Sequence, residues 1–240
     1  MKFNYNKMKV IILCGGKGKR MGKITRKIPK PLVKIGKIPI IQHKINYYKN
    51  QGLKNFIFCL GYKGNLLKKF LKKKCNNPIF FDGGIESGIL KRIYLARKII
   101  NKSTIISYGD TLAKINFRKL LRNHKKSKAI LSLVAAPIQN PFGLIKWNSK
   151  RKVTNFEEKP TLNHFIGYAV IEPTIFNYLS NKVINFKNGK GMVQAIKILS
   201  SKRLVNVYKF NGLQLTINSL SELKEAKTKI GNYFTFDEIL

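Results

Sequence analysis

Residues 10–21 read VIILCGGKGKRM, an apolar run that opens into a glycine-rich, basic loop. The run predicts a buried strand. The loop predicts a turn in which backbone N–H groups approach phosphate oxygens closely while the Arg20 guanidinium makes a bidentate contact with them. The loop is not a Walker A motif, because no Gly-Lys-Ser/Thr ends it, and it lacks the third glycine of the dinucleotide fingerprint. By itself it fits a tight strand-to-helix turn equally well.

A lysine in a stiff setting follows this loop. Residues 28–33 read IPKPLV, so Pro29 and Pro31 flank Lys30 ten positions after Arg20. Proline fixes its own φ and restricts the residue before it to extended conformations. We therefore expect one lysine held at a defined place beside the loop.

Strands alternate with helices along the chain, which is typical of an α/β domain with a largely parallel sheet. We find no internal repeat and no linker. Residues 144–147 and 153–156, with the turn-prone Asn148-Ser149 between them, predict an inserted β-hairpin that Trp147 packs. The predicted strands cover residues 8–13, 55–60, 78–81, 103–107, 129–135, 142–147, 152–156, 165–171 and 203–209. The predicted helices cover residues 41–51, 64–74, 88–100, 116–125, 173–179, 189–200 and 219–230.

Length and composition indicate one globular domain in the cytoplasm. The chain has 240 residues and is 44% hydrophobic, enough for a core, and no apolar run approaches the ~18 residues that span a bilayer. The first seven residues are polar, so we expect no secretion signal. Cys14, Cys59 and Cys75 are odd in number and widely spaced, which argues against disulfides and against metal-ligand spacing.

The formal net charge of +38 taken alone suggests a nucleic-acid or anionic partner. Lysine fills 40 positions spread over the whole chain, and isoleucine and asparagine are abundant too, as expected when an A+T-rich genome drifts toward their codons. We therefore expect nucleic acid to bind only non-specifically, if at all. Because the chain has only ten carboxylates, each one near a motif can be considered separately as a candidate functional residue.

At this point the sequence resembles the sugar-phosphate nucleotidylyltransferases, whose opening pattern is G-G-x-G-x-R-[LM], a spacer and P-K-P-[LM]. Residues 55–63 (NFIFCLGYK), 108–110 (YGD), 142–143 (FG) and 157–160 (EEKP) look like later motifs of that family, in order over residues 8–175. Residues 59–64, 82–84 and 87–92 are most similar to glucose-1-phosphate cytidylyltransferases.

The resemblance implies a Rossmann-like three-layer α/β fold with a mostly parallel mixed sheet and the inserted hairpin. It implies a single domain over residues 1–240, with a nucleotide-binding half at about 8–115 and a sugar-phosphate-binding half at about 116–240.

The resemblance also implies a reaction of nucleotide-sugar and polysaccharide biosynthesis. A sugar 1-phosphate attacks the α-phosphorus of a nucleoside triphosphate, CTP being favoured, and Mg²⁺ assists. No protein nucleophile is required, because positioning and charge neutralisation do most of the work. The roles it implies are catalytic for Arg20, Lys30 and Lys159, substrate-binding for Gly15, Gly16, Gly18, Gly88, Gly143, Glu158 and Gly167, and Mg²⁺ ligation for Asp110.

The sequence departs from the family on the metal and sugar side. The family's second metal-binding aspartate falls in residues 213–219 (LQLTINS), where Thr216 or Asn218 takes its place, and no Asp or Glu occurs between Glu172 and Glu222. The N-x-G that precedes the family's sugar-binding strand keeps only Gly167. Both losses touch the side of the site that would hold metal and sugar.

Three functions stay open. The first is an active nucleotidylyltransferase in which Asp110 and substrate phosphates hold Mg²⁺; the intact nucleotide-side motifs favour it. The second is a non-catalytic relative that binds nucleotide or nucleotide-sugar. The third, a nucleic-acid-binding protein, has only the net charge behind it. Each candidate residue also has an alternative without a catalytic role: Asp110 as a turn residue, Glu158 as a surface residue and the lysines as solvated side chains. The base, the sugar, the oligomeric state and a start at Met1 or Met8 stay undetermined by the sequence.

Overall fold

The apolar run at residues 10–13 shows how this chain covers both faces of a sheet. It forms β1 (Lys9–Leu13), and because side chains alternate along a strand, Val10 and Ile12 enter one buried cluster while Ile11 enters another. All three side chains are fully buried. The computed structural model describes residues 7–233 of the chain.

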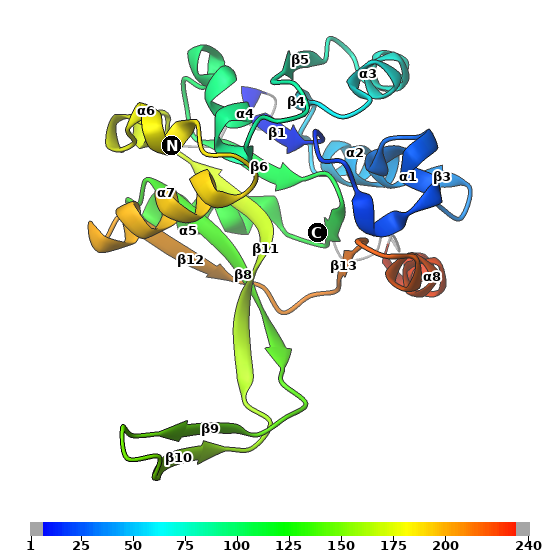
Figure 1. Cartoon of the computed structure of the whole chain (residues 1–240). Helices are drawn as coiled ribbons and strands as arrows, with labels where there is room; N and C mark the ends of the chain where they lie inside the picture. The colour runs from blue at the N-terminus through cyan, green and yellow to red at the C-terminus, as the bar shows by residue number, and fades with distance from the viewer. Residues whose placement is uncertain (1–6, 234–240) are drawn as a thin grey trace.

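Seven strands form one mixed sheet in the order β12-β8-β11-β6-β1-β4-β5 (Figure 1). The pairs β6–β1, β1–β4, β4–β5 and β12–β8 are parallel, and β11 runs antiparallel to both its neighbours. The predicted fold class, a mostly parallel mixed sheet, is confirmed. The other strands of this sheet are β4 (Asn55–Leu60), β5 (Ile79–Asp82), β6 (Thr104–Tyr108), β8 (Leu131–Gln139), β11 (Thr161–Ile171) and β12 (Val205–Lys209).

Helices cover both faces of the sheet and make the three layers. On one face α2, α3 and α5 pack in the cluster that contains Val10 and Ile12, and on the other α4, α6 and α7 pack with Ile11. The helices are α1 (Lys23–Lys27), α2 (Ile40–Asn50), α3 (Gly64–Lys72), α4 (Ile89–Leu95), α5 (Phe117–Ser127), α6 (Asn181–Ile184), α7 (Lys190–Ser201) and α8 (Leu220–Lys229).

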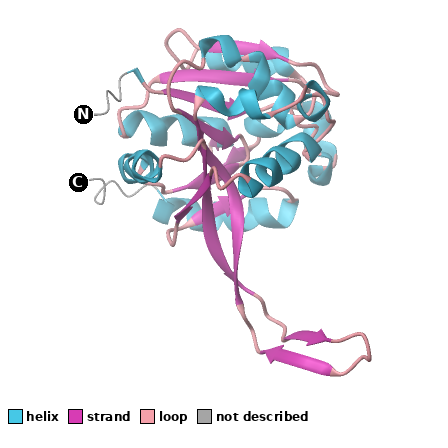
Figure 2. Ribbon diagram, turned by 90° about the vertical axis from the view of Figure 1, so that its left-hand side faces the viewer, coloured by secondary structure: helices cyan, strands magenta, loops and turns pink. Residues whose placement is uncertain are grey.

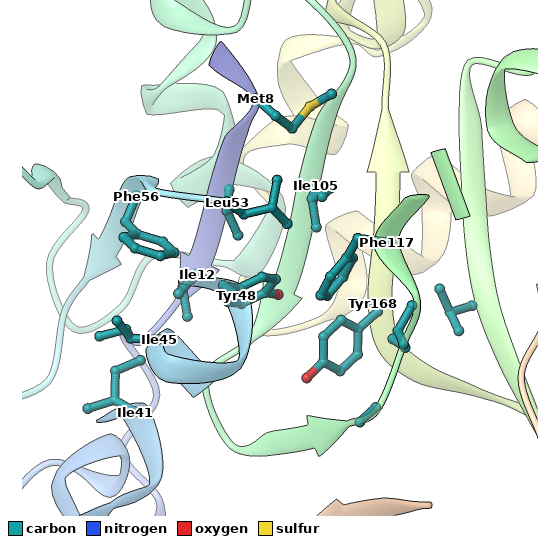
Figure 3. Close-up of a cluster of buried hydrophobic side chains, with 14 of the residues drawn as sticks. Met8, Ile12, Ile41, Ile45, Tyr48, Leu53, Phe56, Ile105, Phe117 and Tyr168 are labelled. Carbon is teal, nitrogen blue, oxygen red and sulfur yellow. The ribbon is translucent and has the colours of Figure 1, made fainter. Parts of the chain in front are cut away.

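The first cluster is rich in aromatic side chains. Tyr48 of α2 stacks on Phe117 of α5 with ring centroids 4.8 Å apart. Both rings are almost fully buried, and burying such a side chain contributes about 1.5–3 kcal/mol. Figure 3 shows how the strand, helix and loop residues of this cluster converge: Met8, Ile12, Ile41, Ile45, Tyr48, Leu53, Phe56, Ile105, Phe117 and Tyr168.

A smaller third cluster lies at the edge of the molecule. It joins α8 to two short two-stranded sheets, β2 (Lys34–Ile35) with β3 (Ile38–Pro39) and β7 (Thr111–Ala113) with β13 (Gln214–Thr216). Strands of two or three residues are too short to show a period of two, so the sequence pattern did not predict them. The β7–β13 pair matters for the site described below.

The structure corrects several predicted boundaries. The predicted helix at 88–100 is α4 followed by a separate 3-10 turn (Arg97–Ile99), and 173–179 is a 3-10 helix (Pro173–Tyr178) rather than an α-helix. The helices α1 and α6 were not predicted. The strand predicted at 129–135 continues to Gln139 as β8, and the strand predicted at 165–171 already begins at Thr161 as β11. Both are longer than predicted because β8 and β11 pair with each other beyond the body of the sheet.

These extensions carry a protruding arm, which we define as residues 137–163. The outer ends of β8 and β11 lead out of the body to β9 (Leu144–Trp147) and β10 (Val153–Glu157), which pair with each other (Figures 1 and 2). The predicted hairpin is therefore confirmed. The expectation that Trp147 packs it is wrong, because that side chain is 65% exposed.

Cys14, Cys59 and Cys75 are buried free thiols. No helix among residues 7–233 is both long and apolar enough to cross a membrane.

Candidate active site

A cleft of about 690 Å³ lies where β1 and β6 end. Ligands bind at the carboxyl ends of parallel strands in open α/β sheets, because loops diverge there and helix N-termini face the opening. Gly15, Gly16, Gly18, Arg20, Lys30 and Asp110, all predicted as site residues, line this cleft together.

The glycine-rich loop forms the base of the cleft. Its entry is held by a hydrogen bond from Cys14 N–H to Cys59 O, and Tyr62 N–H donates to Gly15 O. Gly18 has a left-handed φ of +62°, which favours glycine, and it begins a 3-10 turn (Lys19–Met21). Among residues 7–233, no acceptor takes the backbone N–H of Gly16 or Lys17, so both are available to a ligand.

Lys30 lies where its flanking prolines were expected to hold it. It opens a 3-10 turn (Lys30–Leu32) that follows the extended Pro29, and its stem packs against Gly18. The residue is 8% exposed, and its Nζ donates to Asp110 Oδ2 at 2.6 Å and to Asn218 Oδ1 at 2.9 Å. A single ammonium group therefore joins the two oxygens.

The short β7–β13 ladder brings Asp110 and Asn218 together. Thr111 pairs with Thr216 in that ladder, and Ile217 N–H donates to Asp110 O at 3.0 Å. The side chain of Asn218 also accepts from Arg20 at 2.9 Å. Of the two positions left open by the sequence, Asn218 is therefore the one beside Asp110, while Thr216 lies within the ladder.

Glu222, the first carboxylate after Asn218 in the sequence, forms hydrogen bonds at the start of α8. Glu222 accepts from Asn218 N–H at 2.6 Å and from the Ser219 hydroxyl at 3.0 Å, and Ser219 in turn caps α8. Partial burial opposes ionisation of Glu222, but these hydrogen bonds outweigh it and lower its pKa. Glu222 orients the backbone at Asn218 and does not replace the missing metal carboxylate.

Two basic residues join the loop to the opposite wall. Lys17 pairs with Glu86 at 2.6 Å, and the hydrogen bond and charge of Lys17 lower the pKa of that exposed carboxyl. Arg92 is 5% exposed; it donates to Gly84 O at 2.8 Å and also to Leu60 O. Its guanidinium fills the space where Gly15 and Gly61 lack side chains, which gives a packing reason for both glycines.

A buried lysine lies behind Asp110. Lys44 of α2 is 2% exposed and donates to Thr111 O at 2.6 Å and to the Tyr168 hydroxyl at 2.5 Å. Burial lowers its pKa to about 7, although the nearby Asp110 charge opposes that change. Burial, with a smaller contribution from Asp110, raises the pKa of the cleft-lining Tyr108 to about 12.

Two predicted substrate-binding glycines have packing reasons of their own. A Cβ at Gly88 would lie 2.0 Å from Phe186 O; its neighbours Ser87 and Ile89 line the cleft, and Gly88 does not. Gly167 has a φ of +79° at an irregularity of β11, and its Cα faces the ring of Tyr108. Their contacts with substrate stay predictions.

The remaining three predicted site residues lie elsewhere. Gly143, Glu158 and Lys159 belong to the arm, and no arm residue lines the cleft. Glu158 and Lys159 are more than half exposed and 3.7 Å apart. The structure therefore does not bring the two halves of the expected site together within one chain.

The sequence pattern did not assign roles to Arg92, Lys44 or Asn188, which line or support the cleft. The sequence could not single out Arg92 and Lys44 among the many basic residues, because their burial depends on tertiary packing. His124 bonds Ser132 and Glu172 at 2.7 and 2.8 Å, beside a second cavity.

The donors beside Lys30 fit a hard divalent cation. Asp110 offers a carboxylate and Asn218 an amide oxygen, and Mg²⁺ favours oxygen donors, commonly one or two carboxylates plus substrate phosphates. No group of three or more His, Cys, Asp or Glu side chains that could hold a metal occurs in residues 7–233. A cation here would depend on substrate oxygens for much of its shell.

Two curated relatives are similar to this chain in sequence. The chain is 30% identical to a probable glucose-1-phosphate cytidylyltransferase of Bacillus subtilis, over 91% of this chain and 94% of that one. It is 29% identical to a D-glycero-alpha-D-manno-heptose 1-phosphate guanylyltransferase of Campylobacter jejuni, over 63% and 69%.

Solved structures show the same fold. HddC from Yersinia pseudotuberculosis superposes with a TM-score of 0.72 at 20% identity, over 93% of this chain and 99% of that one. A putative glucose-1-phosphate thymidylyltransferase from Bacillus anthracis gives a TM-score of 0.72 at 18% identity, over 92% and 94%. The model of the nucleotidyl transferase family matches residues 9–228. The chain therefore belongs to the nucleotidyl transferase family.

Proposed function

We propose that this protein joins a sugar 1-phosphate to a nucleoside triphosphate, with CTP favoured, and releases pyrophosphate. The observation that carries the proposal is the convergence of Lys30, Asp110 and Asn218 beside the glycine-rich loop in one cleft. The cytidylyl preference rests on local sequence similarity and on the relatives in Bacillus subtilis and Salmonella typhimurium.

The chain's own residues supply positioning and positive charge. A phosphate oxygen of the sugar 1-phosphate attacks the α-phosphorus of the nucleoside triphosphate. The bond between the α-phosphorus and the oxygen that bridges it to the β-phosphorus breaks, and pyrophosphate leaves on the side opposite the attacking oxygen. The free N–H groups of Gly16 and Lys17 would donate to the triphosphate, and Arg20 and Lys30 would offset its charge. When bound at Asp110 and Asn218, Mg²⁺ would further neutralise the phosphate oxygens.

One measurement tests this activity directly. Purified protein with Mg²⁺ is given each of CTP, UTP, dTTP, GTP and ATP together with sugar 1-phosphates led by glucose 1-phosphate. We expect pyrophosphate release with one pair. Asp110→Asn should lower the rate at least about a hundredfold while a thermal scan shows the variant still folded, because it removes the carboxylate that lies beside Lys30 and Asn218.

A matched variant controls for a general loss of charge. Glu225→Gln removes an exposed carboxylate whose ion-pair partner within residues 7–233 is Lys229 on α8, so its rate should equal that of the unchanged protein. If Asp110→Asn retains full turnover, the assigned role of Asp110 is wrong.

The neutral Asn218 favours a second candidate, a non-catalytic relative that binds nucleotide or nucleotide-sugar. It predicts no pyrophosphate release with any pair, together with a nucleotide-dependent rise in melting temperature. In that case Asn218→Asp is the first variant in which to look for restored turnover.

A further inference from the structure

The short segment that carries Asp110 is held from several sides. Gly109 N–H donates to Leu13 O at the end of β1 at 3.0 Å, and Asp110 O accepts from Ile217 N–H, just after β13, at 3.0 Å. Both bonds join backbone groups, so they place few demands on the side chains at these positions. A third contact depends on side chains, and it is made to the carbonyl of Thr111.

The Thr111 carbonyl points away from the β7–β13 ladder. Successive carbonyls along a strand point to opposite sides, and the carbonyl of Asp110 is the one that faces β13. The Thr111 carbonyl accepts instead from Lys44 Nζ at 2.6 Å and from the Tyr168 hydroxyl at 2.7 Å. Lys44 Nζ also donates to that hydroxyl at 2.5 Å, so the three polar groups form a closed triangle.

This triangle lies behind the cleft and not in it. Lys44, Thr111 and Tyr168 are buried, and none of them lines the cleft. The Tyr168 ring is fixed in the aromatic cluster, where its centroid lies 6.4 Å from that of Phe117 (Figure 3). Groups in this position do not reach a substrate in the cleft, so they can act on the reaction only through the backbone beside Asp110.

A lysine is an unusual residue for so buried a position. Within residues 7–233 no carboxylate forms an ion pair with Lys44. Burial lowers its pKa, which means that its hydrogen bonds offset the desolvation of the ammonium group only in part. What Lys44 supplies is a pair of N–H donors, which the ammonium and the neutral amine both possess, aimed at the segment that carries Asp110.

We propose that Lys44 and Tyr168 are positioning residues, which hold the Thr111 carbonyl and thereby fix the carboxylate of the neighbouring Asp110. That carboxylate accepts from Lys30 Nζ at 2.6 Å in the cleft. The inference rests on the proposed function for the role of Asp110 in the reaction. A misplacement of about 1 Å can cost about a hundredfold in rate, so a support outside the cleft can set the turnover.

Steady-state kinetics separate positioning from binding. Lys44→Met and Tyr168→Phe should each lower kcat about tenfold, and the double variant about a hundredfold. The KM for the nucleotide should stay within about threefold, because the glycine-rich loop, Arg20 and Lys30 are unchanged. A thermal scan verifies that each variant is folded. Tyr168→Phe removes a single oxygen atom, so it still tests the proposal if Lys44→Met does not fold.

Matched variants remove similar groups that serve other carbonyls. Tyr47 of α2 donates its hydroxyl to Ile115 O at 3.1 Å, and Lys49 of α2 donates Nζ to Lys74 O at 2.9 Å. Tyr47→Phe and Lys49→Met should therefore keep the kcat of the unchanged protein. Full kcat in the double variant, or an equal loss in these control variants, overturns the proposal.

Hydrogen exchange tests the support of Asp110 without any turnover. The Ile217 amide donates to Asp110 O, so its exchange rate reports how firmly that segment is held. We expect this amide to exchange at least about tenfold faster in the double variant. The Leu204 amide, which donates to Leu199 O at the end of α7, should exchange at an unchanged rate. Unchanged exchange of the Ile217 amide contradicts the proposal.

The failure of the proposed function is distinguishable from the failure of this inference. An unchanged protein that is inactive with every substrate pair, but whose Ile217 amide exchanges faster in the double variant, contradicts the activity and retains the support of Asp110. Unchanged exchange contradicts that support whether or not the protein is active.

Discussion

Asn218 lies where the family resemblance implies a second metal-binding aspartate. Its amide oxygen shares the ammonium group of Lys30 with Asp110, so the position can contribute an oxygen ligand but no negative charge. Affinity for a hard divalent cation rises with the charge of its ligands. We predict that Asn218→Asp lowers the Mg²⁺ concentration for half-maximal pyrophosphate release about tenfold.

Asn188→Asp is the control for this variant, since Asn188 also lines the cleft, whereas the hydrogen bonds of Lys30 go to Asp110 and Asn218. Its half-maximal Mg²⁺ concentration should stay near that of the unchanged protein. An equal decrease in both variants would show a general effect of cleft charge and not a ligand at position 218.

Lys44 makes a second prediction at the residue scale. Burial lowers its folded pKa to about 7, well below its ordinary value of 10.5. Between these two values the unfolded chain binds the proton and the folded chain does not, so this group makes the free energy of unfolding rise with pH from about 7 upward. Below pH 7 the folded state bears the full cost of charging Lys44.

Lys44→Met keeps most of the side-chain volume and removes the charge. We expect the free energy of unfolding of the variant, minus that of the unchanged protein, to fall as pH rises from 6 to 9, because only the unchanged protein gains stability as Lys44 loses its proton. Urea unfolding of both proteins at pH 6, 7, 8 and 9 measures that difference, in which other titrating groups cancel. A constant difference would contradict the lowered pKa.

At the scale of elements, the irregularity in β11 connects the sheet to the cleft. Gly167 has a left-handed φ, and its Cα faces the ring of Tyr108, which lines the cleft two residues before Asp110. Alanine in a left-handed conformation costs about 1–2 kcal/mol, and overpacking against a ring costs about 1–3 kcal/mol more. Gly167→Ala should therefore destabilise the protein by about 2–5 kcal/mol in chemical denaturation.

Gly36 offers a matched control, because it has a φ of +63° with no heavy atom near the position of a Cβ. Gly36→Ala should show only the conformational cost of about 1–2 kcal/mol. Equal losses of stability in the two variants would mean that the Tyr108 ring moves to accommodate the added methyl group at no cost.

At the scale of the whole molecule, the net charge of +38 predicts a salt-sensitive attraction to any polyanion. The anisotropy of a labelled 20-base-pair duplex should show binding at 50 mM salt that weakens at least about a hundredfold by 200 mM, with no preference among sequences. Tight binding that persists at 200 mM salt would support a dedicated nucleic-acid function instead.

Much of the site was predictable because its signals are local. The strand before the glycine-rich loop, the loop itself, the proline-flanked Lys30 and the strand before Asp110 each depend on a few neighbouring residues. The structure places all of them at one cleft, as their motifs predicted. The predicted substrate and metal contacts of these residues stay predictions.

What could not be predicted depends on pairing between distant segments. The choice between Thr216 and Asn218 follows from a three-residue ladder that joins positions about a hundred residues apart, too short to leave a periodic signal. The burial of Lys44 and Arg92 depends on packing, and in a chain with 48 basic residues nothing local singles them out.

The sequence by itself determined the fold class and the chain order of the seven strands of the main sheet, since periodicity and backbone restriction act over a few residues. The tertiary structure alone decided that Asn218 faces Asp110 and that the arm stands away from its cleft. Those outcomes depend on long-range strand register, where a shift of one residue turns every side chain to the opposite face.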